Sequence, residues 1–142
     1  MSEKVQVIIL STAENLLEVL LLQTNPNRGL FWQNITGGVE ASDPDISHAA
    51  KREILEETGL NISANQIQSL NYSFSYHDKN RNIRYQEHFF VVVLDAKIKL
   101  SISAEHNDYL WKPASMVTQA DYGFKSNFNG LLLSLQHVNK RS

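Results

Sequence analysis

Three glutamates lie close together in one short segment of the chain. Glu53, Glu56 and Glu57 are spaced so that a helix would project all three from one side. Like-charged pairs at such spacing destabilise an isolated helix by about 0.2–0.5 kcal/mol each, and negative charge near a helix C-terminus is also unfavourable. A hard cation such as Mg²⁺ prefers oxygen ligands and would offset this repulsion. The cluster by itself indicates a metal site and a solvated acidic helix face about equally.

The glutamates belong to a longer pattern. Gly38 is followed by thirteen residues and then by Arg52-Glu53, an apolar residue, Glu56-Glu57 and Gly59-Leu60. This order resembles the Nudix box, the loop–helix–loop motif of the Nudix hydrolases. The resemblance implies a Nudix-type fold and hydrolysis of a nucleoside diphosphate linked to another group, with Mg²⁺, or Mn²⁺ as a possible substitute.

The resemblance also implies roles for individual residues. Glu53, Glu56 and Glu57 would bind the metal ions. Arg52 would hold a glutamate in place through an ion pair, and the carbonyl of Gly37 would join the metal ligands.

One position departs from the family pattern. The box carries a glutamate six residues after its first glycine, and counting from Gly38 that position is Pro44. Counting from Gly37, it is Asp43, which keeps a carboxylate and makes the loop one residue longer. We favour the second alignment, in which Asp43 supports the loop and caps the helix and Pro44 opens it.

Three further segments resemble the bacterial dihydroneopterin triphosphate pyrophosphohydrolases, also described as dATP pyrophosphohydrolases. They are residues 31–40, 104–111 and 125–127. By this resemblance, Glu105 lies on a loop that reaches the metals, as a further ligand or as the general base, and an exposed loop carboxylate is the alternative. The neighbouring His106 and the other histidines are interpreted as structural or exposed.

Candidate contacts to the substrate lie outside the glutamate cluster. Trp32 could stack on a purine or pterin, or pack at the end of a strand. Gln33 and Thr36 could donate hydrogen bonds to the substrate or satisfy the loop backbone. Arg84 and Lys125 could contact phosphate, although a solvated surface position is the commoner role of such side chains.

These residues predict metal-assisted hydrolysis of a nucleoside or pterin triphosphate to a monophosphate and pyrophosphate. Water is the expected nucleophile, and Glu56, Glu57 or Glu105 would accept its proton. One alternative is another Nudix activity, such as dNTP sanitation or hydrolysis of a dinucleoside polyphosphate or ADP-ribose. The other is a non-catalytic Nudix module that binds a nucleotide, which would not require all three glutamates.

A helix must carry the glutamate cluster. Asp43-Pro44-Asp45 is a helix-start signal, and the spacing of the apolar residues that follow predicts a helix over residues 44–58. Gly59 is its expected C-cap. Ile54 and Leu55 are expected to turn toward the core.

Strand and helix patterns flank this segment. Residues 5–10 and 16–22 predict a hairpin, and residues 67–76 and 84–95 predict a longer one. The fold class predicted from this order is α+β, a Nudix-type α/β/α sandwich in which helices flank a mixed sheet. The remaining expected elements are a short strand at 97–102, a short helical segment at 114–119 and an amphipathic helix at 128–138.

Length and composition limit the other possibilities. The chain has 142 residues, which predicts a single domain over 1–142. It has no cysteine, which excludes disulfides and thiolate chemistry, and its net charge of −2 argues against binding to nucleic acid or to an anionic membrane. We expect a cytoplasmic protein with a small-molecule partner, and a monomer and a homodimer both remain open.

Overall fold

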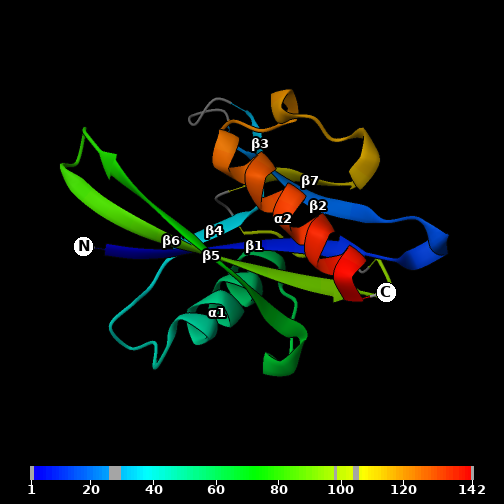
Figure 1. Ribbon diagram of the computed structural model, residues 1–142, viewed down its shortest axis with the longest axis horizontal. Coiled ribbons are helices and arrows are strands. Elements are labelled where there is room, and N and C mark those ends of the chain that lie inside the picture. Colours follow the sequence, from blue (N-terminus) through cyan, green and yellow to red (C-terminus); the bar gives the residue numbers. More distant parts are fainter. Residues whose placement is uncertain (1, 26–29, 98, 104–105, 142) are drawn as a thin grey trace.

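The computed structural model describes residues 2–25, 30–97, 99–103 and 106–141. These residues form a seven-stranded sheet with helix α1 (Ile46–Thr58) on one face and helix α2 (Lys125–Arg141) on the other (Figure 1). The predicted α+β class and the helix–sheet–helix layering are confirmed. Within the described part of the chain, no helix is long and apolar enough to span a membrane.

Strand β1 (Ser2–Ser11) lies at the centre of the sheet. Along its whole length it pairs in parallel with β6 (Ile83–Leu94). Its other edge is shared by two antiparallel strands, β4 (Ile35–Gly38) at one end and β2 (Glu18–Thr24) at the other. The sheet is completed by β5 (Ile67–Asp78) beside β6, and by β3 (Trp32–Gln33) and β7 (His106–Pro113) beside β2.

Side chains of β1 alternate between two hydrophobic cores. Val5, Val7 and Ile9 pack in the core that includes α1, whereas Ile8 and Leu10 pack in the core that includes α2. Both faces of β1 are therefore buried, which explains why its sequence is a nearly continuous apolar run.

Both predicted hairpins are confirmed as β1–β2 and β5–β6. The sequence did not indicate β3, β4 or β7, because β3 and β4 are short, the Gly-Gly pair that ends β4 is typical of a turn, and Pro113 ends β7. The strand expected at 97–102 is wrong, since the residues described there carry no regular structure. The helical segment at 114–119 is two 3₁₀ turns, Ala114–Met116 and Gln119–Asp121, and the helix expected at 128–138 is the longer α2.

The start of α1 differs from the prediction. The N-cap is Asp45, whose carboxylate accepts from the His48 N–H at 2.7 Å, so the helix begins at Ile46 rather than at Pro44. Asp43 does not cap the helix because Arg52 occupies its carboxylate. At the other end Gly59 is the C-cap, as predicted, with φ of +77°.

The apolar face of α1 also needs one correction. Ile54 is fully buried as expected, but Leu55 is 48% exposed. Consecutive helical residues lie about 100° apart, so burial of Ile54 against the sheet turns Leu55 toward solvent.

Candidate active site

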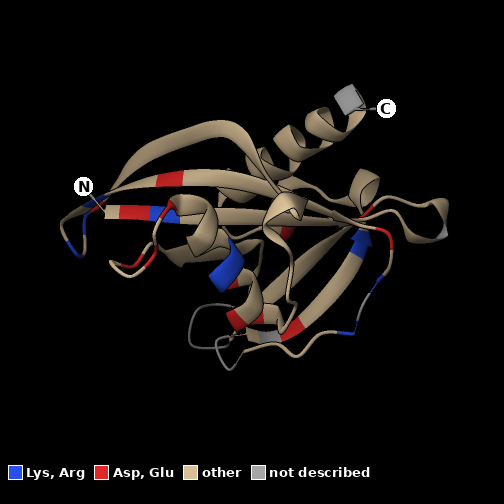
Figure 2. Cartoon of the chain, turned by 90° about the horizontal axis from the view of Figure 1, so that it is seen from below, with Lys and Arg blue, Asp and Glu red and all other residues tan. Residues whose placement is uncertain are grey.

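The acidic cluster of α1 faces a cavity of about 420 Å³, here called the acidic cavity. Glu53 and Glu57 are buried beside it, whereas the Glu56 side chain is 53% exposed. Figure 2 shows that the acidic positions of α1 follow its basic pair toward one end of the helix. The lining is completed by the β4 edge, the loop that follows it and the segment after β6: Thr36, Gly37, Gly38, Glu40, Glu53, Glu56, Glu57 and Ser103.

Arg52 is the centre of an ion-pair network in this site. Its guanidinium donates to both carboxylate oxygens of Asp43, at 3.1 and 2.9 Å, and to the Gly38 carbonyl at 2.8 Å. It also donates to Glu53 at 2.9 Å and lies 3.3 Å from Glu56. This planar fork fixes the loop against the helix, in a way that a single point charge would not.

Asp43 is the loop side of this network. Its carboxylate also accepts from the Glu40 N–H at 2.7 Å and is almost completely buried. The hydrogen bonds from Arg52 and Glu40 lower the pKa of Asp43. The structure therefore places a carboxylate in the supporting position of the favoured alignment.

Gly37 and Glu53 are in close contact. A Cβ atom at Gly37 would overlap the Glu53 carboxylate, whereas a Cβ at Gly38 would meet nothing within 4 Å. Only a glycine at position 37 lets the backbone of β4 approach this carboxylate.

The surroundings of Glu53 disfavour its ionised form. Burial, and secondarily the charge of Glu57, raise its pKa to about 7, although Arg52 acts in the opposite direction. A carboxylate with this environment gains from any additional cation.

Glu57 has a partner that the sequence did not indicate. The Nε2 atom of His106 lies 2.7 Å from a Glu57 oxygen, and both side chains are at most 5% exposed. His106 stands at the start of β7, an unpredicted strand far along the chain from α1, so no local pattern could have linked the two.

The donor set suits a hard divalent cation. Glu53, Glu56 and Glu57 line one cavity and offer only carboxylate oxygens, which is the ligand chemistry of Mg²⁺. In the described residues, no three His, Asp or Glu side chains converge in a way that could hold a metal ion. Glu53 and Glu56 both contact Arg52, and Glu57 contacts His106. Glu105 lies outside the described residues.

A second cavity of about 580 Å³, here called the aromatic cavity, lies on the α2 side of the sheet and shares Thr36 with the acidic cavity. Of the predicted substrate contacts, Gln33, Thr36 and Lys125 line it. Trp32 instead packs, half-buried, in the α2-side core, and Arg84 is exposed and lines neither cavity. The full lining is Lys4, Gln33, Thr36, Phe74, Tyr76, Asp78, Asn80, Glu87, Phe124, Lys125, Ser126 and Asn127.

A buried hydrogen-bond network fixes the junction of β3 and β4 against α2. The Asn34 backbone N–H donates to the Asn127 side chain at 2.7 Å, and the Asn34 amide donates to Gln6 at 2.9 Å. The Tyr122 hydroxyl donates to Asn34 at 3.0 Å. This network holds Gln33 and Thr36 in place beside the first turn of α2 and was not predicted from the sequence.

Two known proteins are similar to this chain over most of its length. The dihydroneopterin triphosphate diphosphatase of Haemophilus influenzae is 28% identical over 128 residues, covering 83% of this chain and 78% of that protein. The solved dihydroneopterin triphosphate pyrophosphohydrolase of E. coli superposes with a TM-score of 0.76 at 24% identity, covering 91% of each chain.

Another relative is matched only in part. The octanoyltransferase of Myxococcus xanthus is 32% identical over 93 residues, covering 66% of this chain. The chain spans about a quarter of the length of that protein, 26%.

A family model covers most of the chain. The model of the NUDIX domain matches residues 3–129, a range that includes both cavities and the whole of α1. The chain belongs to the NUDIX domain family and is a Nudix hydrolase, an enzyme that acts on phosphorus-containing acid anhydrides.

Proposed function

We propose that this enzyme hydrolyses a pterin or nucleoside triphosphate, dihydroneopterin triphosphate or a dATP-like compound, to the monophosphate and pyrophosphate. One observation carries the proposal: an oxygen-rich acidic cavity and an aromatic cavity meet at Thr36. A substrate with a flat ring at one end and a triphosphate at the other could place the ring in the aromatic cavity and the phosphates in the acidic cavity. The Haemophilus and E. coli relatives, named for action on dihydroneopterin triphosphate, support this choice.

The acidic cavity would hold Mg²⁺, or Mn²⁺ in its place. Glu53, Glu56 and Glu57 are the proposed ligands, joined by the Gly37 carbonyl and by Glu105. When bound, such a cation offsets phosphate charge and lowers the pKa of a water molecule. Arg52 keeps Glu53 and the glycine loop in position for this role.

The proton of the attacking water needs an acceptor in the same cavity. Glu56 and Glu57, which line this cavity, are two candidates, and Glu105, which lies outside the described residues, is the third by its resemblance to the family. The buried contact with His106 fixes the orientation of the Glu57 carboxylate, whereas Glu56 is more exposed. A side chain that is already oriented loses less entropy when it acts.

The aromatic cavity would hold the ring of the substrate. Gln33, Thr36 and Lys125 line it and are the proposed polar contacts. Of these, Thr36 lines both cavities, so it would lie beside the link between the ring end and the phosphates. Trp32 and Arg84 do not line this cavity, so we do not assign them a contact with the substrate.

Product analysis by chromatography tests the proposal. The protein is incubated with Mg²⁺ and dihydroneopterin triphosphate, each dNTP, diadenosine tetraphosphate and ADP-ribose. Pyrophosphate released fastest from dihydroneopterin triphosphate or a dNTP is the expected result. Fastest cleavage of ADP-ribose or the dinucleoside would overturn the proposed substrate, and omission of the metal should abolish turnover.

A further inference from the structure

One deeply buried carboxylate in the aromatic cavity has no part in the phosphate chemistry. Glu87 of β6 is only 5% exposed, yet it lines the cavity. A buried charge is costly unless hydrogen-bond donors surround it. The role of Glu87 concerns the ring end of the substrate and therefore rests on the proposed function.

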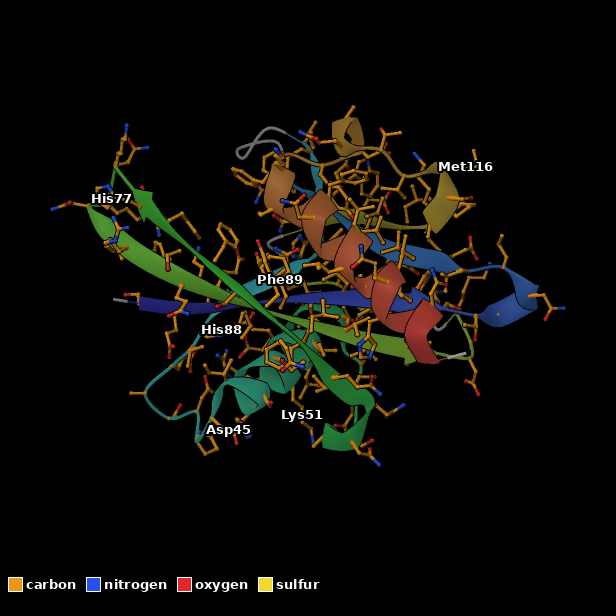
Figure 3. All side chains as sticks on the ribbon, viewed as in Figure 1. Asp45, Lys51, His77, His88, Phe89 and Met116 are labelled. Atoms are coloured by element: carbon orange, nitrogen blue, oxygen red, sulfur yellow. The ribbon has the colours of Figure 1, made fainter. Side chains whose placement is uncertain are left out.

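The register of the sheet defines the direction of Glu87. Its direct cross-strand neighbours are Lys4 on β1 and Phe74 on β5. Direct neighbours point to the same face, and Phe89, two residues further along β6, packs in the α2-side core beside α2 (Figure 3). Glu87 therefore faces the α2 side, across the sheet from the acidic cluster of α1.

Few groups on the protein compensate the charge of Glu87. Burial raises its pKa, and the charge of Lys4 and the amide of Gln6 act in the opposite direction. The Lys4 ammonium also lies 4.5 Å above the ring of Tyr85. Asp78, the other carboxylate of the lining, already accepts from the backbone N–H groups of Asn80 and Arg81, so it is less suited to a ligand.

Aromatic side chains surround this carboxylate. The rings of Phe74 and Tyr76 are stacked, with centroids 5.3 Å apart and planes 24° apart. Phe124, which is 59% exposed, lines the same cavity from the segment before α2. These surfaces suit a flat ring system, and the cavity then offers its edge a buried acceptor.

We propose that Glu87 determines specificity by accepting hydrogen bonds from two adjacent N–H groups on the edge of the substrate ring. A 2-amino-4-oxopyrimidine edge, which pterins and guanine share, offers a ring N–H and an amino group side by side. The two oxygens of a carboxylate match this pair. Adenine offers a ring nitrogen with a lone pair next to its amino group, and a carboxylate would repel it. A carboxylate at this position therefore favours a pterin or guanine ring over an adenine ring.

The test compares substrates with different ring edges, of which dGTP, dITP and dATP share the same purine skeleton, sugar and triphosphate. Initial rates are measured with dihydroneopterin triphosphate, dGTP, dITP, which lacks the amino group, and dATP, for the wild type and for Glu87→Gln. We expect the wild type to hydrolyse dihydroneopterin triphosphate and dGTP fastest, dITP more slowly and dATP slowest. Glu87→Gln replaces one acceptor by a donor, so kcat/KM for dihydroneopterin triphosphate and dGTP should fall about 10- to 100-fold, while that for dATP changes by less than about threefold.

Two controls separate recognition from folding. Glu3→Gln on β1 removes the same charge from the opposite face of the sheet, where Glu3 contacts His88, and should leave the substrate order unchanged. Glu87→Asp keeps the charge and should preserve the preference for dGTP over dATP. An equal loss of rate on every substrate after Glu87→Gln, or a wild type that prefers dATP, would overturn the inference and leave Glu87 as a structural partner of Lys4.

Binding measurements distinguish failure of this inference from failure of the proposed function. Calorimetry with dGTP and dATP in the presence of a chelator reports the ring preference without turnover. Preference for dGTP that disappears in Glu87→Gln supports the role of Glu87, even if no triphosphate is cleaved and the proposed function fails. Equal binding of dGTP and dATP by the wild type overturns the role of Glu87, even if both are cleaved.

Discussion

The two cavities on either side of Thr36 are built in different ways. The acidic cavity takes most of its charged lining from one helix and the loop before it. The aromatic cavity takes its lining from strands β1, β3, β4, β5 and β6 and from the start of α2. In this molecule the residues for chemistry are local in sequence, whereas the residues for recognition meet only after the sheet forms.

The cavities also differ in charge. The acidic cavity holds four glutamates against the single guanidinium of Arg52, whereas in the aromatic cavity two lysines balance the two carboxylates of Asp78 and Glu87 beside several aromatic rings. Substitutions beside the acidic cavity should therefore change kcat, and those beside the aromatic cavity should change KM and substrate order.

Glu57→Gln should have the largest effect. It keeps the volume and the contact with His106 but removes a charged ligand, so kcat should fall about 10²- to 10³-fold in excess Mg²⁺. Turnover and thermal melting are measured together, with Glu3→Gln as the charge-matched control. Near-normal turnover would exclude Glu57 from the reaction.

Gly37→Ala and Gly38→Ala form a matched pair. The added methyl group at position 37 overlaps the Glu53 carboxylate, whereas at position 38 it meets nothing within 4 Å. We expect kcat to fall about 10- to 100-fold for Gly37→Ala and much less for Gly38→Ala. Equal losses in the two variants would show that displacement of Glu53 is not the cause.

Arg52→Lys tests the ion-pair network. A lysine cannot replace the fork that joins Asp43, Gly38 and Glu53. We expect about a tenfold lower kcat and a higher Mg²⁺ requirement, measured by metal titration. The reciprocal change Lys51→Arg, on the neighbouring residue, is the control, and an unchanged metal requirement in Arg52→Lys would contradict the supporting role.

Glu53→Gln should stabilise the metal-free protein above neutral pH. The raised pKa of Glu53, about 7, means that ionisation of this residue opposes folding as pH rises from about 4.5 through 7. The variant avoids this cost, so at pH 8 in chelator its free energy of unfolding should exceed that of the wild type by about 1–3 kcal/mol. The difference should disappear near pH 4.5, and denaturant unfolding at the two pH values measures it. A difference that does not change with pH would contradict the raised pKa.

Lys125→Ala should have the smallest effect. This exposed lysine lines the aromatic cavity, and exposed charge contacts contribute only about 0.2–1 kcal/mol. We expect KM to rise about two- to fivefold with kcat unchanged, in contrast to Lys99→Ala, which lies outside both cavities. A fall in kcat without a change in KM for Lys125→Ala would contradict the view that the aromatic cavity serves substrate binding and the acidic cavity serves catalysis.

The local part of the molecule could be predicted from the sequence. The two hairpins, the layering and the helix that carries Glu53, Glu56 and Glu57 follow from periodicity and from a contiguous motif. Errors at the start of α1 arose because Asp43 and Asp45 are both capable caps, and only the position of Arg52 decides between them.

The non-local part could not be predicted. Glu87 lies inside an apolar strand, and nothing near it in sequence indicates that Lys4 and Phe74 flank it. Likewise, His106 reaches Glu57 only because β7 joins the sheet next to β2. Such pairings depend on which strands become neighbours and in what register, and the local patterns of the sequence do not reveal either.

The parallel pairing of β1 with β6 has a consequence for biogenesis. Ser2 pairs with Tyr85 and Ser11 with Leu94, so at about 5–20 residues per second β6 is synthesised roughly 4–17 seconds after β1. During this interval the apolar residues of β1 around Ile8 lack the β6 strand with which they pair in the folded sheet. The high sequence separation also slows the search for the correct register. Nascent chains of this enzyme are therefore expected to need protection by chaperones, and both cavities can assemble only late in folding.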